Sequence, residues 1–283
     1  MSDLTDKAIT GQVRAFYEEM PFNYYATAED AAQRVAANPI LSYPDLDALL
    51  GDDAIDRVLE IGCGVGWASN AIALNYKSKV TAVDMTQKAL DRAREVSRLI
   101  GTEDRTTFVQ SDLFDFQPES RFDLVLSIGV LHHTYDCRKA FDHVSRLVDK
   151  GGFLFVGLYH LAGRRVFLQM FKDILAEGGE EAAFQRFAAL NAPQRDETHM
   201  RSWFRDQVLH PNETQHSLEE VFGWLDQNGL ELISTSINGY EDVADRQVLI
   251  EDEAAYEALS RSRNYEENRF FPGFFTVLAR RPD

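Results

Sequence analysis

The sequence predicts an α/β protein with a doubly wound, mostly parallel sheet of seven strands. Three observations support this fold class. Short β-rich apolar segments alternate with helical segments from Asp56 onward, as expected for a parallel sheet with helices on both faces. A glycine-rich turn follows the first strand, and carboxylates recur near the ends of the first three. Open α/β sheets bind ligands at that edge.

The predicted elements follow one another in a regular order. Helical patterns occupy Thr86–Leu99 and Arg138–Val148 between strands, and Ser217–Glu220 is a capping box that starts an amphipathic helix. Asn228-Gly229 ends that helix. The predicted strands are Arg57–Ile61, Lys79–Asp84, Thr107–Gln110, Asp123–Ser127, Phe153–Leu158, Glu231–Ile237 and Phe274–Ala279.

Four segments are expected along the chain. Residues 1–50 read as an N-terminal helical lid, in which Thr27–Asp30 starts a helix and Asn38-Pro39 stops it. Residues 51–160 form the cofactor-binding core. Residues 161–216 form a helical insertion after the fifth strand, a substrate cap with loops at Glu177–Glu181 and Asn191–Thr198. Residues 217–283 complete the sheet and carry an acidic helical excursion at 241–267.

Composition narrows the class of protein. The formal net charge is −17, which disfavours nucleic-acid and anionic membrane partners. The longest strongly apolar run, Phe153 to Leu161, is too short to cross a bilayer, and the N-terminus has no signal-peptide pattern. The two cysteines, Cys63 and Cys137, form no disulfide framework and no metal spacing. We therefore expect a cytoplasmic protein without a metal.

The most specific string is Val58-Leu59-Glu60-Ile61-Gly62-Cys63-Gly64-Val65-Gly66. Glycines in such a turn allow the backbone to approach a ligand closely, and the helix that follows presents free N–H groups. A dinucleotide fingerprint needs a further glycine where this chain has Trp67. A carboxylate at Glu60 would repel a pyrophosphate, but it suits a ligand with an ammonium group, such as S-adenosylmethionine.

Two more carboxylates end the following strands. Asp84 is placed to accept hydrogen bonds from both ribose hydroxyls, and Asp112 from the adenine amino group. Either residue could instead be a helix cap or turn residue, since Asp is favoured there. Three carboxylates at successive strand ends favour a ligand site.

These motifs resemble the class I (Rossmann-like) S-adenosylmethionine-dependent methyltransferases, and most closely a small-molecule branch similar to ubiquinone/menaquinone-type enzymes. The resemblance spans roughly residues 55–160 and includes Val83-Asp84, Ser111–Leu113, Phe122–His133 and Leu147–Gly152. It departs from the family at Lys150, where the family usually has proline. It implies that the last strand is antiparallel.

The resemblance also implies the cofactor site. Glu60, Gly62 and Gly64 would hold the methionine end of S-adenosylmethionine, Asp84 the ribose and Asp112 the adenine. The product would be S-adenosylhomocysteine. Other expected cofactor contacts are Tyr17, Cys63, Met85, Leu113 and Ile128.

Catalytic candidates lie after the fourth and fifth strands, which face the methyl group in this fold. They are His132, His133, Tyr159 and His160, of which a histidine is suited to accept a proton near neutral pH. One of the adjacent histidines could instead pack against the sheet. In the aromatic N-terminal segment, Arg14, Tyr17 and Tyr24 are the expected ligand contacts of a lid, although this segment could also be a docked helix.

The insertion supplies candidate substrate contacts. We expect Tyr24, Arg201, Arg205 and His210 to bind substrate, and an arginine there would suit an anionic one. Ion pairs with Asp196, Glu197 or Asp206 would equally explain these arginines. The predicted activity is methyl transfer to an O or N atom of a small molecule, with a possible homodimer. The alternatives are a catalytically silent S-adenosylmethionine-binding module and a methyltransferase that acts on a macromolecule.

Overall fold

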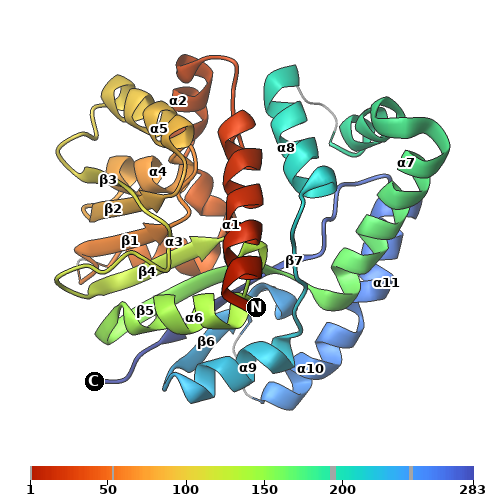
Figure 1. Ribbon diagram of the computed structural model, residues 1–283. Coiled ribbons are helices and arrows are strands. Elements are labelled where there is room, and N and C mark those ends of the chain that lie inside the picture. Colours follow the sequence, from red (N-terminus) through yellow and green to blue (C-terminus); the bar gives the residue numbers. More distant parts are fainter. Residues whose placement is uncertain (1, 53, 192–195, 242–244) are drawn as a thin grey trace.

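The computed structural model describes residues 2–52, 54–191, 196–241 and 245–283. Within them, seven strands form a single sheet with the order β3-β2-β1-β4-β5-β7-β6 (Figure 1). The strands are β1 (Arg57–Ile61), β2 (Lys79–Asp84), β3 (Thr106–Gln110), β4 (Phe122–Ile128), β5 (Val148–Tyr159), β6 (Glu231–Thr235) and β7 (Phe274–Arg280).

Strand directions confirm the predicted fold class. The pairs among β1 to β5 are parallel, whereas β7 runs antiparallel to both β5 and β6. The strand order reverses at β1, which lies between β2 and β4. A crevice at the carboxyl end of such a sheet is the usual ligand site of doubly wound proteins.

Helices cover both faces of the sheet. Alternation along β1 places Val58 in the cluster with α2, α3 and α4, and Leu59 in the cluster with α6 and α9. The helices are α1 (Ser2–Glu19), α2 (Ala28–Ala36), α3 (Pro44–Leu50), α4 (Trp67–Asn75), α5 (Gln87–Ile100), α6 (Cys137–Arg146), α7 (Leu161–Leu190), α8 (Glu197–Leu209), α9 (Leu218–Gln227), α10 (Arg246–Ala254) and α11 (Tyr256–Arg261).

The predicted helix starts are confirmed by cap geometry. The Thr27 side chain accepts a hydrogen bond from the Asp30 N–H at the start of α2. At α9, the Ser217 side chain accepts from the Glu220 N–H, and the Glu220 carboxylate accepts from the Ser217 N–H. Each cap satisfies backbone donors that would otherwise lack a helical partner.

Replacing Ser217 with alanine is expected to lower the free energy of unfolding by about 1 kcal/mol, because one donor at the start of α9 loses its acceptor. Thermal unfolding should show a decrease of roughly 2–4 °C in Tm. Ser217→Asp retains a capping oxygen and should restore most of the loss. Equal destabilisation by both substitutions would contradict a capping role.

The insertion after β5 is helical, as predicted, but it contains a kinked helix where a loop was expected. We expected a loop at Glu177–Glu181; instead α7 continues through it, with a kink at Gly179 (φ 74°, ψ −171°). Glycine adopts this backbone conformation without a Cβ clash, so two helical halves remain in one element. Of the second expected loop, residues 192–195 lie outside the described residues.

The insertion has a hydrophobic core of its own. Phe167, Phe171 and Phe187 of α7 are buried against Phe204 of α8. The described part of the acidic excursion is also helical: α10 and α11 follow β6, and α11 lies beside α7 (Figure 1). The Ser260 hydroxyl donates to the Gly163 carbonyl at 2.7 Å, which fixes the two helices together. Residues 242–244 of the excursion lie outside the described residues.

The N-terminal helix α1 crosses the carboxyl edge of the sheet, with α5 on one side and α8 on the other (Figure 1). The Lys88 ammonium of α5 donates to the Glu19 carbonyl, and Arg205 of α8 forms an ion pair with the Glu19 carboxylate at 2.9 Å. Contacts on both sides therefore hold α1 over the edge where the strands end. Among the described helices, none is long and apolar enough to span a membrane.

Candidate active site

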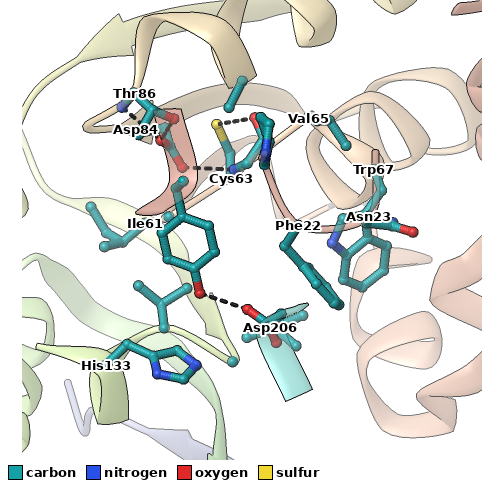
Figure 2. Close-up of a pocket in the computed structure, with 18 of the residues that line it drawn as sticks. Phe22, Asn23, Ile61, Cys63, Val65, Trp67, Asp84, Thr86, His133 and Asp206 are labelled. Atoms are coloured by element: carbon teal, nitrogen blue, oxygen red, sulfur yellow. Dashed lines mark hydrogen bonds between the residues drawn. The ribbon is translucent and has the colours of Figure 1, made fainter. Parts of the chain in front are cut away.

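A cavity of about 630 Å³ lies at the carboxyl edge of the sheet, beneath α1 and α8. Its size is within the range of small-molecule sites. Figure 2 shows Asp84, Thr86 and Cys63 at one end of it and His133 and Asp206 at the other. Of the predicted cofactor residues, those that line it are Tyr17, Gly62, Cys63, Gly64, Asp84, Met85, Asp112, Leu113 and Ile128.

The glycine-rich turn forms one wall of the cavity. The Gly62 and Cys63 N–H groups donate to the Val83 carbonyl at 2.8 and 3.0 Å, which ties the turn to the end of β2. Gly62 has φ +73°, and a Cβ there would lie 2.4 Å from the Val130 side chain. Gly64 has φ +52°, and no atom lies within 4 Å of its hypothetical Cβ. A ligand can therefore approach the backbone at Gly64 closely.

Two carboxylates stand beside this turn. Asp84 accepts hydrogen bonds from the Gly64 N–H at 2.8 Å and from the Thr86 N–H and hydroxyl at 2.9 and 2.7 Å. Burial raises the pKa of Asp84, against the effect of these hydrogen bonds. Asp112 accepts from the Phe114 N–H at 2.9 Å. Both carboxylates line the cavity while their own turns hold them in place.

The Glu60 side chain lies on the face of β1 that packs against α4. It is 2% exposed and accepts a hydrogen bond from the Ser69 hydroxyl of α4. Burial raises its pKa to about 7. The cavity lining found among the described residues does not include it. Its side chain supports the start of α4, and a direct cofactor contact stays a prediction.

His133 is the predicted catalytic histidine that reaches the cavity. Its Nδ1 lies 2.9 Å from the Asn212 carbonyl oxygen. Because a carbonyl only accepts, Nδ1 carries the proton and Nε2 has a free lone pair. Nε2 is buried, and no hydrogen-bond partner for it exists in the described part of the chain. Burial lowers the pKa of His133 to about 4, so the ring is neutral at pH 7.

The other catalytic candidates differ in their access to the cavity. Tyr159 lines it. His132 is fully buried behind His133, with its ring 4.0 Å from the Tyr159 ring centroid. In the described residues His132 does not belong to the cavity lining. It therefore corresponds to the alternative of a histidine packed in the core.

His160 lies at the start of α7, and it is not part of the described lining of the cavity. Its Nδ1 accepts from the Gly163 N–H at 3.0 Å and so caps α7, while Nε2 lies 2.8 Å from Glu253. Both ring nitrogens are thus engaged by the protein. A catalytic role for His160 has no supporting contact.

Helix α8 contributes a carboxylate that sequence analysis did not assign to the site. Asp206 is 5% exposed, lines the cavity and accepts from the Tyr17 hydroxyl at 2.6 Å and from Gln207 Nε2 at 2.8 Å. Burial raises the pKa of Asp206. Only the fold shows which residues of the string Trp203-Phe204-Arg205-Asp206-Gln207 line the cavity.

The predicted substrate residues are placed mostly around the cavity and not in it. Arg201 forms ion pairs with Glu197 and Glu181, and Arg205 with Glu19. Tyr24 lies on the outer side of α5, where its hydroxyl accepts from Arg92 at 3.0 Å. The described lining contains none of these three side chains. The ion-pair alternative for the two arginines thus corresponds to the contacts observed.

His210 and Arg14 complete the predicted set. The His210 ring packs on the His133 ring with centroids 3.7 Å apart, and burial lowers its pKa to about 3. It therefore supports His133 from behind. Arg14 is exposed on α1 and, within the described residues, is outside the cavity lining.

Aromatic side chains form another wall, and the sequence analysis did not assign the five described next to the site. Phe22 stacks on Trp203 with centroids 5.7 Å apart, and Trp203 contacts Phe270 at 5.8 Å. Tyr43 and Trp67 face each other at 6.4 Å on the opposite side. All five line the cavity. We call these five side chains, together with His133 and Asp206 of the same cavity lining, the acceptor chamber.

Comparison with known proteins supports the assignment of this fold. The methyltransferase domain family matches residues 59–156. An uncharacterised protein of Synechococcus sp. is 29% identical over 64% of this chain and 48% of its own length. The 27-O-demethylrifamycin SV methyltransferase of Amycolatopsis mediterranei is 29% identical over 47% of this chain and 46% of its own. The chain thus spans about half the length of these relatives.

Solved structures show the same fold. Magnesium protoporphyrin IX methyltransferase from Synechocystis PCC 6803, with bound SAH, has a TM-score of 0.51 and 16% identity, over 99% of this chain and 96% of its own. PKMT2 from Rickettsia typhi has a TM-score of 0.57 and 15% identity, over 80% of this chain and 49% of its own. Residues 59–156 thus match the methyltransferase domain family, and the sheet with its flanking helices has the class I, Rossmann-like methyltransferase fold.

Proposed function

We propose that this protein transfers a methyl group from S-adenosylmethionine to an O or N atom of a small molecule. The observation that carries the proposal is one cavity that joins two kinds of wall. The Gly62–Gly64 turn, Asp84 and Asp112 form one part of the lining, and His133, Asp206 and the aromatic side chains form another part. Donor and acceptor would thus share a single enclosed space.

The first part of the lining fits the cofactor. Gly64 leaves room for a ligand against the backbone. Helix α4 begins at Trp67, and Gly66 before it supplies no side-chain cap, so the first N–H groups of the helix, at Trp67 and Ala68, can donate to a carboxylate. Asp84 would accept from the ribose hydroxyls and Asp112 from the adenine amino group. When bound, S-adenosylmethionine supplies an electrophilic methyl group on sulfur and leaves as S-adenosylhomocysteine.

His133 would accept the proton that the acceptor loses. Its Nε2 lone pair is the free basic atom, because Nδ1–H is held by the Asn212 carbonyl. Asp206 and Tyr17 lie beside it, with the Tyr17 and His133 ring centroids 6.4 Å apart. Closure by α1 and α8 would exclude water, which strengthens these interactions.

A small-molecule acceptor agrees with the enclosed cavity and with several relatives. Their names describe methyltransferases for rifamycin and for ajmaline, although others act on a release factor or on a tRNA base. The cofactor role of Glu60, the cytoplasmic location and the homodimer stay predictions. An anionic substrate held by Arg201 or Arg205 gains no support, because carboxylates of the protein already bind both.

Calorimetry with S-adenosylhomocysteine is expected to show one saturable site per chain. Asp84→Asn should weaken this binding at least about tenfold, because hydrogen bonds to a charged group contribute about 1.5–3 kcal/mol. Asp91→Asn, at an exposed carboxylate of the neighbouring helix α5, should have no effect and serves as the control.

Absence of binding by the unmodified protein would overturn the proposed function. Binding without methyl transfer to any acceptor would favour the alternative, a silent module that binds the cofactor for regulation. A slow-turnover assay that follows S-adenosylhomocysteine release separates these two outcomes.

A further inference from the structure

We propose that the acceptor chamber selects an apolar, ring-bearing molecule whose reacting group donates a hydrogen bond, a hydroxyl or an amine, and discriminates against a carboxylate at that position. This inference rests on the proposed function and specifies its substrate class. The chamber's walls, its polar atoms and the partners of the nearby arginines each support it.

The walls are suited to a flat apolar body. Phe22 and Trp203 stack with an interplanar angle of 21°, so a broad aromatic surface faces the cavity. Tyr43 and Trp67 face it from the side of α3 and α4, and Phe274 from β7. Ring systems gain both area burial and ring–ring contacts on such walls.

Four hydrogen-bond donors around this chamber are already used. The Tyr17 hydroxyl and Gln207 Nε2 both donate to Asp206. Trp203 Nε1 donates to Asn23 Oδ1 at 3.2 Å, and His199 Nε2 lies 2.6 Å from the same oxygen. These four groups therefore have little capacity left for an acceptor atom on a ligand.

Asp206 and His133 Nε2 keep capacity to accept hydrogen bonds. Asp206 receives one hydrogen bond on each oxygen, and each carboxylate oxygen has a second lone pair. His133 Nε2 is buried with no partner in the described part of the protein. A hydroxyl or amine can donate to these atoms, whereas a carboxylate cannot. The chemistry of the site is thus complementary to a donor.

The nearby arginines cannot compensate a buried carboxylate on the ligand. The Arg164 guanidinium is fully buried and paired with Glu213 at 2.7 Å, and Arg205 is paired with Glu19. Among the described residues, the cation that lines the cavity is Arg34, which is exposed to solvent and hydrogen-bonded to Tyr25. An anion beside Asp206 would therefore lose hydration without gaining a partner.

The test uses the full chain saturated with S-adenosylhomocysteine and two matched pairs of probes. The pairs are 2-naphthol with 2-naphthoate, and 4-phenylphenol with 4-phenylbenzoate, titrated by calorimetry at pH 7.5. In at least one pair, the phenol is expected to bind at least tenfold more tightly than the carboxylate. Asp206→Asn should weaken phenol binding at least tenfold and narrow the difference within the pair.

Asp226→Asn is the control, because this exposed carboxylate of α9 is paired with Arg246 away from the chamber. Binding of neither phenol, equal or tighter binding of the carboxylates, or an unchanged preference in Asp206→Asn would each overturn the inference. The initial S-adenosylhomocysteine titration tests the proposed function separately. If the cofactor product binds but the phenols do not, the chamber assignment fails while the proposed function stands.

Discussion

Replacement of His133 by asparagine is expected to reduce methyl transfer by about 10²- to 10⁴-fold, the usual contribution of a positioned general base. Asparagine retains a side-chain N–H that can donate to the Asn212 carbonyl, but it has no atom at the position of Nε2. The substitution thus removes the free lone pair while conserving the hydrogen bond that orients the side chain. S-adenosylhomocysteine affinity should be unchanged.

The measurement is the single-turnover rate with a phenol or amine that the unmodified protein methylates. His143→Asn is the matched control. His143 of α6 lies 3.2 Å from the Phe116 carbonyl oxygen through its Nε2, and it is not part of the described cavity lining. A rate within threefold of the unmodified protein in His133→Asn would show that the acceptor loses its proton elsewhere.

The pH profile gives a second test of the same residue. Burial lowers the pKa of His133 to about 4, so its proton-accepting form is complete at pH 7 and is lost only as the pH falls through about 4. His133 therefore contributes no limb to the rate profile between pH 5 and 8. A single-turnover acid limb near pH 6.5 that disappears in His133→Asn would contradict this.

Replacement of Arg164 by methionine is expected to lower the free energy of unfolding by about 3–5 kcal/mol, because it leaves the Glu213 carboxylate, whose side chain is only 12% exposed, without its partner. Arg164 is fully buried, and its Nε and Nη2 donate to the two oxygens of Glu213 at 3.0 and 2.7 Å. Nη2 also donates to the Gln207 carbonyl at 2.8 Å. The guanidinium further lies 3.7 Å from the Tyr159 ring centroid.

Thermal unfolding should show this loss as a decrease of roughly 6–20 °C in Tm. Arg165→Met provides the comparison, since its ion pair with Glu257 has side chains 67% and 46% exposed and contributes less than about 1 kcal/mol. Similar Tm values for the two variants would show that burial of the Arg164–Glu213 pair has no energetic consequence.

The sequence was most informative where local pattern and tertiary position agree. The predicted bounds of β1 and β2 match the structure, because their short apolar runs and flanking turns both depend on short-range chemistry. Strand β5 extends five residues before its predicted start, to Val148, since glycines at 151 and 152 conceal pairing that the neighbouring strand imposes. Gly179 misleads in the opposite way: glycine there predicts a loop, but the structure has only a kink within helix α7.

The sequence by itself determined the sheet, the glycine turn and the carboxylates at its strand ends, because strand ends of a parallel sheet meet at one edge whatever the rest of the chain does. Only the tertiary structure decided which side chains of the insertion enter the cavity. Along α8, Trp203, Asp206 and Gln207 line it, whereas Arg201 and Arg205 pair with glutamates outside. The packing of α8 against α1 and α7 sets the rotation of α8 about its own axis, and so decides which of its side chains face the cavity. The residues that make these packing contacts are far apart in the chain.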